Sequence, residues 1–552
     1  MQTRDGNLHL EIQTSRKNPV GILRTSYRDK STGKMLHTQH GRIAGCTLEQ
    51  LRLLQLGFRQ QVIPESSPDA FRIIRSREWG ASHAVLQLLK GLGLHRILYS
   101  RSEPWVDSVC AMIVGRIVFQ GSKLGLCNRW EDTCLWELCA VQERPDVEER
   151  CYLPLDRLLK RQKAIQKKLA QAHLQDGCLV LYDITSSYFE GAYQESEIVQ
   201  FGYNRDGKKG HEQIVIGMLC TKDGCPIGCE VFSGNTNDSS TVLDKVTELR
   251  EQYGLSKLVF VGDRGMVTEA RLKELRDING LNTISALTHR QIVQLLEKKV
   301  IQAELFDEHK IVEVHDPQSP AQRYFLCRNP LSREKETNTR KRLLDLTVQG
   351  LSQLAAYKQS VTVETLGSRV GKLLAKYKMG KFIDWHIDAD TQKNKSRSHR
   401  LVWKLKEEKI ASEALLDGCY IVHTDVAKET MNSEQVVQTY KDLGHVERAF
   451  RNLKTVQLEI RPVYHKKDDR IRAHVFLCML AYYVQWHMHK RLEPLFSGDE
   501  KGKNRRWTFE SVIEQLRQIT SNTVQVGKVQ FEQISQPTET QKQIINLLTS
   551  AM

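Results

Sequence analysis

Apolar runs of strand length begin abruptly after residue 177. The runs CLVLYDIT, QIVIGMLCT and PIGCEVFSG follow one another, and Asp223-Gly224 stands between the second and third as a tight hairpin signal. A helical stretch over 239–253, the buried-strand run LVFVGD, a second helix over 269–276 and the run LNTISAL come next. Three meandering strands followed by alternating helix and strand predict a mixed α/β sheet over 176–300.

The segments on either side of this core follow other patterns. Short strand-like pieces over 1–45 predict a small β element, and helical periodicity over 46–175 predicts an N-terminal DNA-binding or accessory domain. Strand-like pieces separated by polar, basic loops over 301–430 predict a β-rich insertion. Helices are expected again over 431–492, and residues 493–552 are expected to form a helical C-terminal region.

The charge of the chain narrows the class of partner. Its 552 residues include 81 Lys and Arg against 66 Asp and Glu, a formal charge of +15. A basic balance of this size favours nucleic acid first and an anionic membrane surface second. The longest apolar run, 475–484, is about half the roughly 20 residues that span a bilayer, so we expect an intracellular, unanchored protein.

The cysteines give a weaker signal. Thirteen are scattered singly, and the closest cluster, Cys220, Cys225 and Cys229, has no second ligand pair at zinc spacing. Reduced, mostly buried thiols are therefore a better interpretation than a zinc site.

The most informative segment is 432–454, NSEQVVQTYKDLGHVERAFRNLK. Asn432 and Gln435 have the spacing of a capping pair at the start of a helix. On one continuous helix, Glu447 lies in the middle of an apolar stripe, so its carboxylate is predicted to point inward. The other members of that stripe are Val436, Tyr440, Leu443 and Phe450. A buried carboxylate costs several kcal/mol unless a cation, a metal or strong donors compensate it.

Tyr440, Glu447 and Lys454 stand seven residues apart and project from nearly the same line of such a helix. Arg451 shares that face. An ordinary Arg–Glu pair with a Lys that extends its amine to solvent also fits this pattern.

Two further acids favour a functional site over this ordinary arrangement. Asp183 and Asp263 are each the first acid after an apolar strand, and in open α/β sheets strand ends line the ligand crevice. If the two strands are neighbours and the Glu447 helix packs across their ends, three carboxylates converge. Their repulsion predicts divalent cations between them, and oxygen-only ligands favour Mg²⁺ or Mn²⁺ over zinc.

A pair of such ions activates the attacking oxygen and stabilises the leaving oxygen of an in-line displacement at phosphorus. A basic protein with this site is expected to act on the phosphodiesters of nucleic acid.

The order of these residues resembles the bacterial insertion-sequence DDE transposases. The most similar group has a Tyr-Arg-Glu-Lys signature and a β-stranded insertion before the Glu. The resemblance covers about 177–490 and rests on Asp183, Asp263 and the array Tyr440, Glu447 and Lys454. The segments GNTND, VGDRGM and YHKKDDRIRAHVFLCMLAYYV are also similar to that family.

The resemblance implies a ribonuclease H-like catalytic core and a cut-and-paste reaction. Water nicks the element end, and the freed 3′ hydroxyl attacks another strand; several members form a hairpin intermediate. Asp183, Asp263 and Glu447 would be the catalytic residues and ligands of Mg²⁺, with Mn²⁺ as a substitute. Tyr440 and Lys454 would hold the DNA backbone near the cleaved end.

The resemblance also implies partners and a location. Double-stranded DNA is expected, both as terminal inverted repeats and as target, with a homodimer in the synaptic complex. The expected location is the bacterial cytoplasm, at the nucleoid. Two other functions fit the residues: a non-catalytic DNA-binding protein derived from a transposase, and a structure-specific DNA nuclease.

The chain departs from the signature at one position. Leu443 stands where the signature has Arg, and Arg451 is the candidate to supply the missing guanidinium. Gly444, which costs about 1 kcal/mol relative to Ala inside a helix, suggests a close backbone approach.

Two tryptophans of the expected insertion are candidates for base stacking. Related transposases stack an insertion-domain Trp on a flipped base, and Trp385 and Trp403 are the candidates here. The alternative for each is an ordinary core residue.

Overall fold

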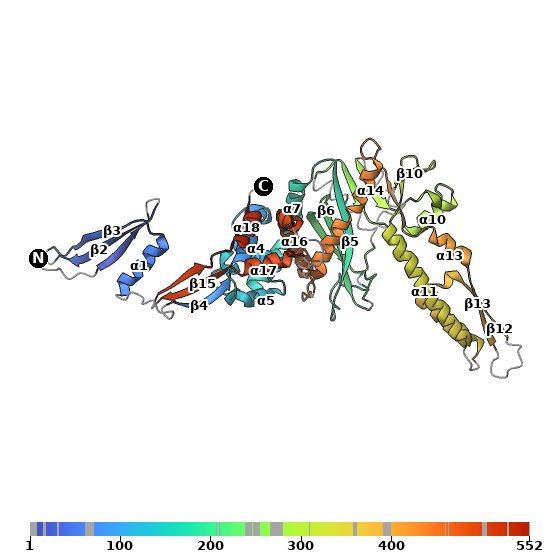
Figure 1. Ribbon diagram of the computed structural model, residues 1–552, viewed down its shortest axis with the longest axis horizontal. Helices are drawn as coiled ribbons and strands as arrows, with labels where there is room; N and C mark the ends of the chain where they lie inside the picture. The colour runs from blue at the N-terminus through green and yellow to red at the C-terminus, as the bar shows by residue number, and fades with distance from the viewer. Residues whose placement is uncertain are drawn as a thin grey trace. The chain divides into compact units, whose positions relative to one another are not determined.

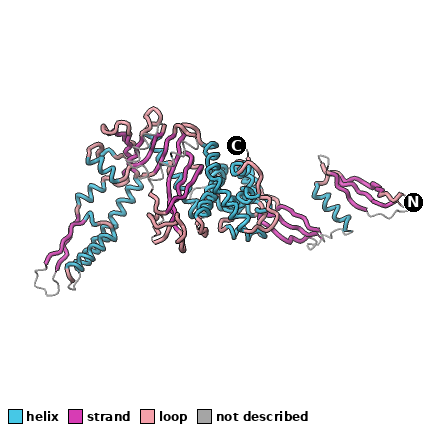
Figure 2. The backbone as a smooth tube through the Cα atoms, turned by 180° about the vertical axis from the view of Figure 1, so that it is seen from behind, coloured by secondary structure: helices cyan, strands magenta, loops and turns pink. Residues whose placement is uncertain are grey.

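The chain divides into two compact units (Figures 1 and 2). One comprises Met1–His95, Ser102–Cys151 and His487–Met552, and the other comprises Arg96–Arg101 and Tyr152–Trp486. The computed structural model describes residues 8–14, 18–29, 32–60, 71–205, 207–208, 210–237, 246, 254–264, 280–307, 310–356, 361–389, 399–456, 458, 460–461, 463–498, 505–526 and 529–550.

The second unit is built on an eight-stranded sheet of order β10-β11-β14-β9-β8-β5-β6-β7. Its strands are β5 Cys178–Tyr188, β6 Gln213–Thr221, β7 Pro226–Ser233, β8 Leu258–Gly262, β9 Leu281–Ala286, β10 Val312–His315, β11 Arg323–Arg328 and β14 Cys419–Thr424. β8 pairs in parallel with β5 and β9, and the other neighbours are antiparallel. The prediction of a mixed α/β sheet is therefore confirmed.

Local sequence explains how the central strands are joined and aligned. β6 and β7 meet at the predicted turn, where Gly224 has a φ of +83°, in the left-handed region that favours glycine. The starts of β5 and β8 are held together by Asp176, whose carboxylate accepts hydrogen bonds from Ser256 Oγ (2.6 Å) and the Lys257 N–H (2.7 Å).

Several helices belong to this unit. They are α7 Leu153–His173, α10 His289–Glu297, α11 Pro330–Ala356, α12 Val363–Tyr377, α13 Glu407–Ala414, α14 Ser433–Lys441 and α15 Gly444–Arg451. α7 contacts β7, α14 contacts β8, β9 and β14, and α15 contacts β5 and β6. The division between the two units falls within two helices, α3 (Leu94–Leu98) and α16 (Asp468–Ser497), so each contributes residues to both units. The helices expected over 239–253 and 269–276 lie outside the described residues, apart from Val246, which is helical.

The β-rich insertion expected over 301–430 is corrected by the structure. β10, β11 and β14 extend the main sheet, and the excursion between β11 and β14 contains α11, α12, α13 and one hairpin, β12 Ile383–Ala389 with β13 His399–Leu405. We call residues 330–417 the arm. α11 was missed because, of its 27 residues, only Thr347 and Leu351 are buried, which leaves no apolar stripe to mark it as a helix.

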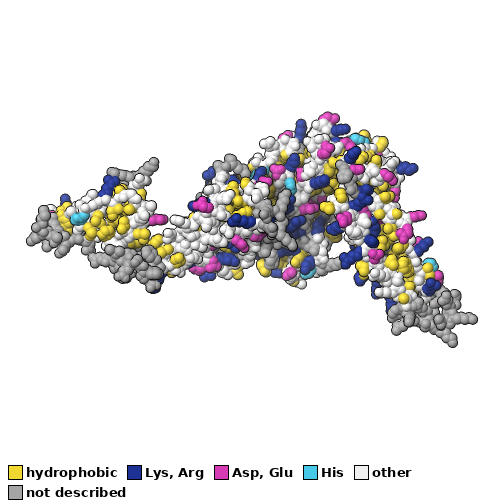
Figure 3. Space-filling view, in the orientation of Figure 1, with side chains coloured by type: hydrophobic (Ala, Val, Ile, Leu, Met, Phe, Trp, Pro, Cys, Tyr) yellow, Lys and Arg dark blue, Asp and Glu magenta, His cyan; other side chains and the backbone are white. Residues whose placement is uncertain are grey.

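The arm has a hydrophobic cluster of its own, and Figure 3 shows hydrophobic side chains gathered along it. The buried members are Leu351, Leu366, Val370, Leu374, Met379, Phe382, Ile383 and Leu401. The arm leaves and rejoins the sheet at one place, because the Asn329 N–H donates to the Gly418 carbonyl at 2.8 Å.

The first unit is built from segments of both the N-terminal and the C-terminal part of the sequence. Its helices are α1 Leu48–Gln60, α2 Gly80–Gly91, α4 Pro104–Val118, α5 Lys123–Asn128, α6 Leu135–Leu138, α17 Phe509–Arg517 and α18 Glu539–Thr549. α2 contacts α4, α6, α17 and α18, which brings early and late segments into one helical layer.

The strands of this unit form two small sheets. One has the order β1-β2-β3, formed by Leu8–Gln13, Val20–Arg28 and Met35–Ile43, where the small β element was expected. The other has the order β16-β15-β4, formed by Val529–Ile534, Thr520–Val526 and Phe71–Glu78. The mainly helical segment expected over 46–175 contains α1 to α7 and in addition β4. The expectation of a helical C-terminal region is corrected, because β15 and β16 accompany α17 and α18 there, and β15 pairs with β4.

Two further expectations concern membranes and thiols. No single described helix is both long and apolar enough to cross a membrane; one bent pair, Pro104–Val118 with Lys123–Glu131, passes on length and composition, with 94° between its halves. All thirteen cysteines are free, and most are buried.

Candidate active site

Asp183 and Asp263 stand side by side on two parallel strands. The register of β5 and β8 runs to Tyr182↔Gly262, and one further step in the same register places the two aspartates next to each other. Each carboxylate accepts a hydrogen bond from the backbone N–H of the residue that follows it, at 2.8 Å for Asp183 and 2.7 Å for Asp263. Asp263 directly follows the end of β8, as the strand-end argument predicted. The same argument is wrong for Asp183, which lies in the middle of β5 because the strand continues to Tyr188.

Glu447 brings a third negative charge to this point. α15, which carries it, packs against β5 and β6. Burial, together with the charges of Asp263 and Glu447, raises the pKa of Asp183 to about 7, while the N–H of Ile184 and the charge of Arg205 oppose the shift. Asp183 thus experiences both other acids, and the structure brings together the three carboxylates singled out from the sequence.

The segment that carries Glu447 is not one helix. α14 ends at Lys441, α15 begins at Gly444, and a π-helical turn, Asn452–Val456, follows. Glu447 is exposed, whereas its α15 neighbours Val446, Ala449 and Phe450 are buried. The prediction that Glu447 points inward from an apolar stripe is therefore wrong, because the break changes the helical phase. An exposed carboxylate keeps its hydration and stays accessible to a cation.

The start of α14 is held by local and distant contacts. Asn432 and Gln435 form the predicted capping box, each accepting the other's backbone N–H at 2.9 Å. The buried guanidinium of Arg323 on β11 donates to the carbonyls of Val426 (3.0 Å) and Met431 (2.9 Å). The turn that leads into α14 is consequently fixed to the sheet.

Tyr440 orients one of the acids. Its hydroxyl donates to Asp263 Oδ1 at 3.0 Å. Burial and the charge of Asp263 raise the pKa of Tyr440, and the neighbouring guanidinium of Arg264 opposes the shift. Arg264 therefore lies beside Tyr440, a contact that the sequence analysis missed. The only signal for it was the position of Arg264 directly after Asp263 in VGDRGM.

Lys454 also reaches β5, the strand that carries Asp183. Its Nζ donates to Thr185 Oγ1 at 2.6 Å. Thr185 is two residues beyond Asp183 on β5, so the two side chains share one face of the strand. Tyr440 and Lys454 thus each donate a hydrogen bond close to an aspartate, Tyr440 to Asp263 itself and Lys454 to Thr185 on the strand of Asp183.

The departure from the signature has a structural reason. Leu443 is only 6% exposed and precedes the first residue of α15. A Cβ at Gly444 would meet no atom within 4 Å, so the expected close approach at this glycine is wrong. The close approach occurs at Gly224, where a Cβ would lie 2.7 Å from the Cβ of His445. The β6–β7 turn therefore supports the first turn of α15.

Arg451 and Arg264 are the two guanidinium candidates. Arg451 is exposed on α15, whereas Arg264 interacts with the Tyr440 hydroxyl beside Asp263. The geometry favours Arg264 over Arg451 as the cation next to the acids.

Trp385 and Trp403 face each other across the β12–β13 ladder of the arm, in a different sheet from the acids. Trp403 packs against the hydrophobic cluster of the arm, while Trp385 is 36% exposed. Of the two, Trp385 offers the more accessible ring.

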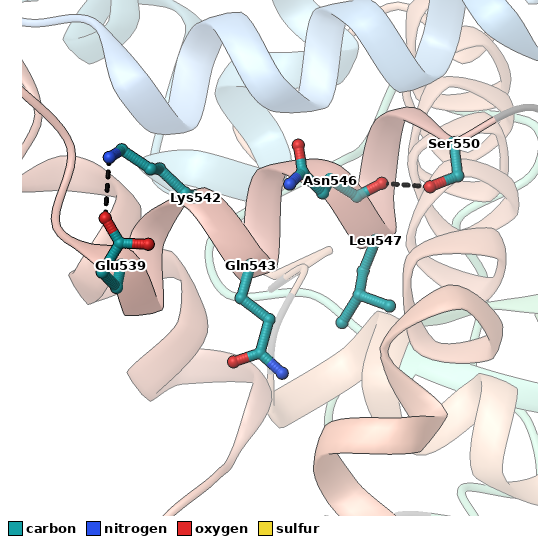
Figure 4. A pocket seen from close by; sticks show the side chains of 6 residues that line it. All are labelled: Glu539, Lys542, Gln543, Asn546, Leu547 and Ser550. Carbon is teal, nitrogen blue, oxygen red and sulfur yellow. Dashed lines mark hydrogen bonds and ion pairs between the residues drawn. The ribbon is translucent and has the colours of Figure 1, made fainter.

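A pocket of about 370 Å³ lies along α18 in the first unit (Figure 4). It is lined by Glu539, Lys542, Gln543, Asn546, Leu547 and Ser550, and Lys542 pairs with Glu539 at 2.8 Å. No residue of the acidic cluster lines this pocket.

Three acids that converge beside two parallel strands, in a strongly basic chain, form the class of site at which divalent cations assist phosphodiester chemistry. The family model for the transposase DDE domain matches residues 175–484, more than half of the chain and the span that holds all three acids. The chain belongs to this family and is a DDE transposase.

The other comparisons are more distant. A cryo-EM structure of the piggyBac transposase synaptic complex with hairpin DNA is similar at 9% identity, with a TM-score of 0.37 over 79% of each chain. No curated protein matches the sequence.

Proposed function

We propose that this protein is the cut-and-paste transposase of a bacterial insertion sequence, with a ribonuclease H-like catalytic core. It cleaves the ends of its element and joins them to target DNA. One observation carries the proposal: the charges of Asp263 and Glu447 converge on Asp183, whose pKa burial has already raised.

The acids suit a divalent cation. Asp183, Asp263 and Glu447 offer carboxylate oxygens alone, the ligands that Mg²⁺ and Mn²⁺ prefer, and their mutual repulsion is relieved by positive charge. These three residues would hold Mg²⁺, with Mn²⁺ as a substitute. The bound metal would supply an activated attacking oxygen and stabilisation of the leaving oxygen.

The neighbouring residues hold the acids and the DNA. Tyr440 fixes Asp263 through its hydroxyl, and Lys454, bonded to Thr185, contacts a backbone phosphate near the cleaved end. Arg264 supplies the guanidinium that the signature places at position 443, with Arg451 as a second phosphate contact.

Trp385 and Trp403 of the arm would stack on a flipped base if a hairpin intermediate forms.

The expected partners are DNA and a second copy of the chain. The formal charge of +15 suits double-stranded DNA, bound both as terminal inverted repeats and as target. A synaptic homodimer would hold the two ends together. We place the protein in the bacterial cytoplasm, at the nucleoid.

The test is cleavage of an element-end duplex by the purified protein with Mg²⁺. The wild type should nick the end and join it to target DNA. Asp183→Asn and Glu447→Gln should each lower the rate about a thousand-fold or more, because either change removes a ligand charge. Glu434→Gln, a matched change at an exposed acid on α14, should cleave like the wild type.

Persistent cleavage by Asp183→Asn would overturn the proposal. Binding without cleavage by the wild type would instead support the non-catalytic DNA-binding protein, an alternative favoured by Leu443 in place of the signature Arg. Cleavage without strand joining would support the structure-specific nuclease.

A further inference from the structure

The loop between β5 and β6 and the segment that follows the Glu447 helix form one surface. Both belong to the second unit, and hydrogen bonds tie them together. The bonds run from Tyr193 Oη to Val463 O (2.8 Å), from Lys466 Nζ to Ala192 O (2.9 Å) and from Glu197 N to Asp468 Oδ2 (2.9 Å). We call the described residues of 189–212 and 460–468 the platform.

The backbone of the platform is pinned to the sheet. Gln200 and Gln213 exchange backbone hydrogen bonds of 3.0 and 2.9 Å. A Cβ at Gly202 would lie 2.0 Å from the carbonyl oxygen of Gly234, so this close packing requires glycine. The Arg205 N–H donates to Ser186 Oγ at 2.9 Å, three residues beyond Asp183 on β5. The loop is thus anchored next to the strand that carries a catalytic acid.

Large aromatic side chains project from this fixed backbone into solvent. Phe201 is 64% exposed, Tyr203 is 82% exposed and Tyr464 is 71% exposed. They are the three most exposed aromatic side chains among the described residues. Exposed aromatic rings held on an ordered backbone offer stacking surfaces without a large loss of conformational freedom on binding.

Cations are interleaved with the aromatic rings. The Arg205 guanidinium lies 5.9 Å from the ring centre of Tyr203. The Tyr188 ring, at the end of β5, lies 4.3 Å from the Arg461 guanidinium and 5.7 Å from the Lys208 amine. Glu190, Glu195 and Glu197 precede Phe201, and from Phe201 to Glu212 the loop has Arg205, Lys208 and Lys209 against Asp206 and Glu212. The part that bears Tyr203 therefore has a small positive formal charge, to which Arg461 of the second segment adds.

This combination suits DNA whose bases are unpaired. In a duplex the faces of the bases are hidden in the stack, so exposed aromatic rings gain little from it, whereas a single strand offers both phosphates and free faces. We infer that the platform binds unpaired nucleotides of the DNA strand beside the active site. Their bases stack on Phe201 and Tyr203, and their phosphates pair with Arg205 and Arg461. The inference rests on the proposed function, because a nick gives one strand a free end that can unpair beside the active site.

The test uses the full-length protein in EDTA, so that no cleavage occurs. A single strand of about 12 nucleotides that carries 2-aminopurine is compared with the same sequence as a blunt duplex. We expect the single strand to bind with quenched fluorescence, because stacking on an aromatic ring quenches 2-aminopurine. Phe201→Ala with Tyr203→Ala should weaken binding about ten-fold or more and abolish the quenching. Tyr203→Phe, which keeps the ring, should bind like the wild type.

The matched control is Leu331→Ala, which removes a 78% exposed apolar side chain from the arm and should leave binding unchanged. Unchanged binding and quenching in the double alanine variant would overturn the inference. Binding of the duplex as tight as that of the single strand, without quenching, would also overturn it and indicate a plain phosphate surface. Cleavage by the wild type decides the proposed function separately, because this binding assay requires no catalysis.

Discussion

At residue 443 a buried leucine stands where the signature of the proposed group has an arginine. Its side chain is only 6% exposed at the start of α15, so an arginine introduced there would bury a charge. We predict that Leu443→Arg lowers the free energy of unfolding by about 2–4 kcal/mol instead of improving the site. Denaturant unfolding measures this. Leu443→Met is the control, with an expected loss below about 1.5 kcal/mol.

The raised pKa of Asp183 predicts that the stability of the fold depends on pH. Burial, with the charges of Asp263 and Glu447, raises its pKa from 3.8 to about 7, so the folded protein holds this proton more tightly than the unfolded chain. The resulting stabilisation is complete below about pH 4 and is lost as the pH rises to about 7. In EDTA, the unfolding temperature should therefore fall by a few degrees more between pH 5 and pH 8 in the wild type than in Asp183→Asn. Equal falls in the two proteins would contradict this prediction.

The proximity of the three acids could be predicted because each carries a local signal, either an apolar run that an acid follows or the Tyr–Glu–Lys spacing. Arg264 could not, because its significance depends on Tyr440, which lies far along the chain and reaches it only in the folded sheet.

At the scale of elements, the break between α14 and α15 decides where Glu447 points. The capping pair Asn432–Gln435 was predictable, since its bonds span three residues. The break was not, because it depends on burial of Leu443 and on contact between His445 and the β6–β7 turn. The local pattern predicts one continuous helix, but tertiary contacts override this local preference.

Substitutions at two glycines test which contacts cause the break between α14 and α15. Gly224→Ala places a Cβ 2.7 Å from His445 on a backbone with φ of +83°, so we expect a loss of about 1–3 kcal/mol in stability and slower cleavage. Position 444 is helical, and a Cβ added there would meet no atom within 4 Å. Gly444→Ala should therefore stabilise the protein by up to about 1 kcal/mol. Thermal unfolding and end cleavage measure both; a stabilising Gly224→Ala would contradict the assigned contact.

At the scale of the whole molecule, the arm is a separable insertion between β11 and β14. It has its own hydrophobic cluster, and its two ends meet where Asn329 bonds to Gly418. We predict that a short Gly-Ser turn in place of 331–416 leaves a folded protein that retains Asp183-dependent nicking of DNA. Circular dichroism and a nicking assay measure these properties. Global unfolding of the shortened protein would show that the arm supports the sheet.

Sequence alone determined the features that act over a few residues. These are the apolar runs of the strands, the turn at Gly224, the cap at Asn432 and the acid that follows β8, since each depends on neighbours along the chain. Tertiary structure alone decided the outward direction of Glu447, the bond from Tyr440 to Asp263 and the pairing of β4 with β15. These features join groups that are distant in sequence, and only the packed sheet and its helices bring such groups within bonding distance.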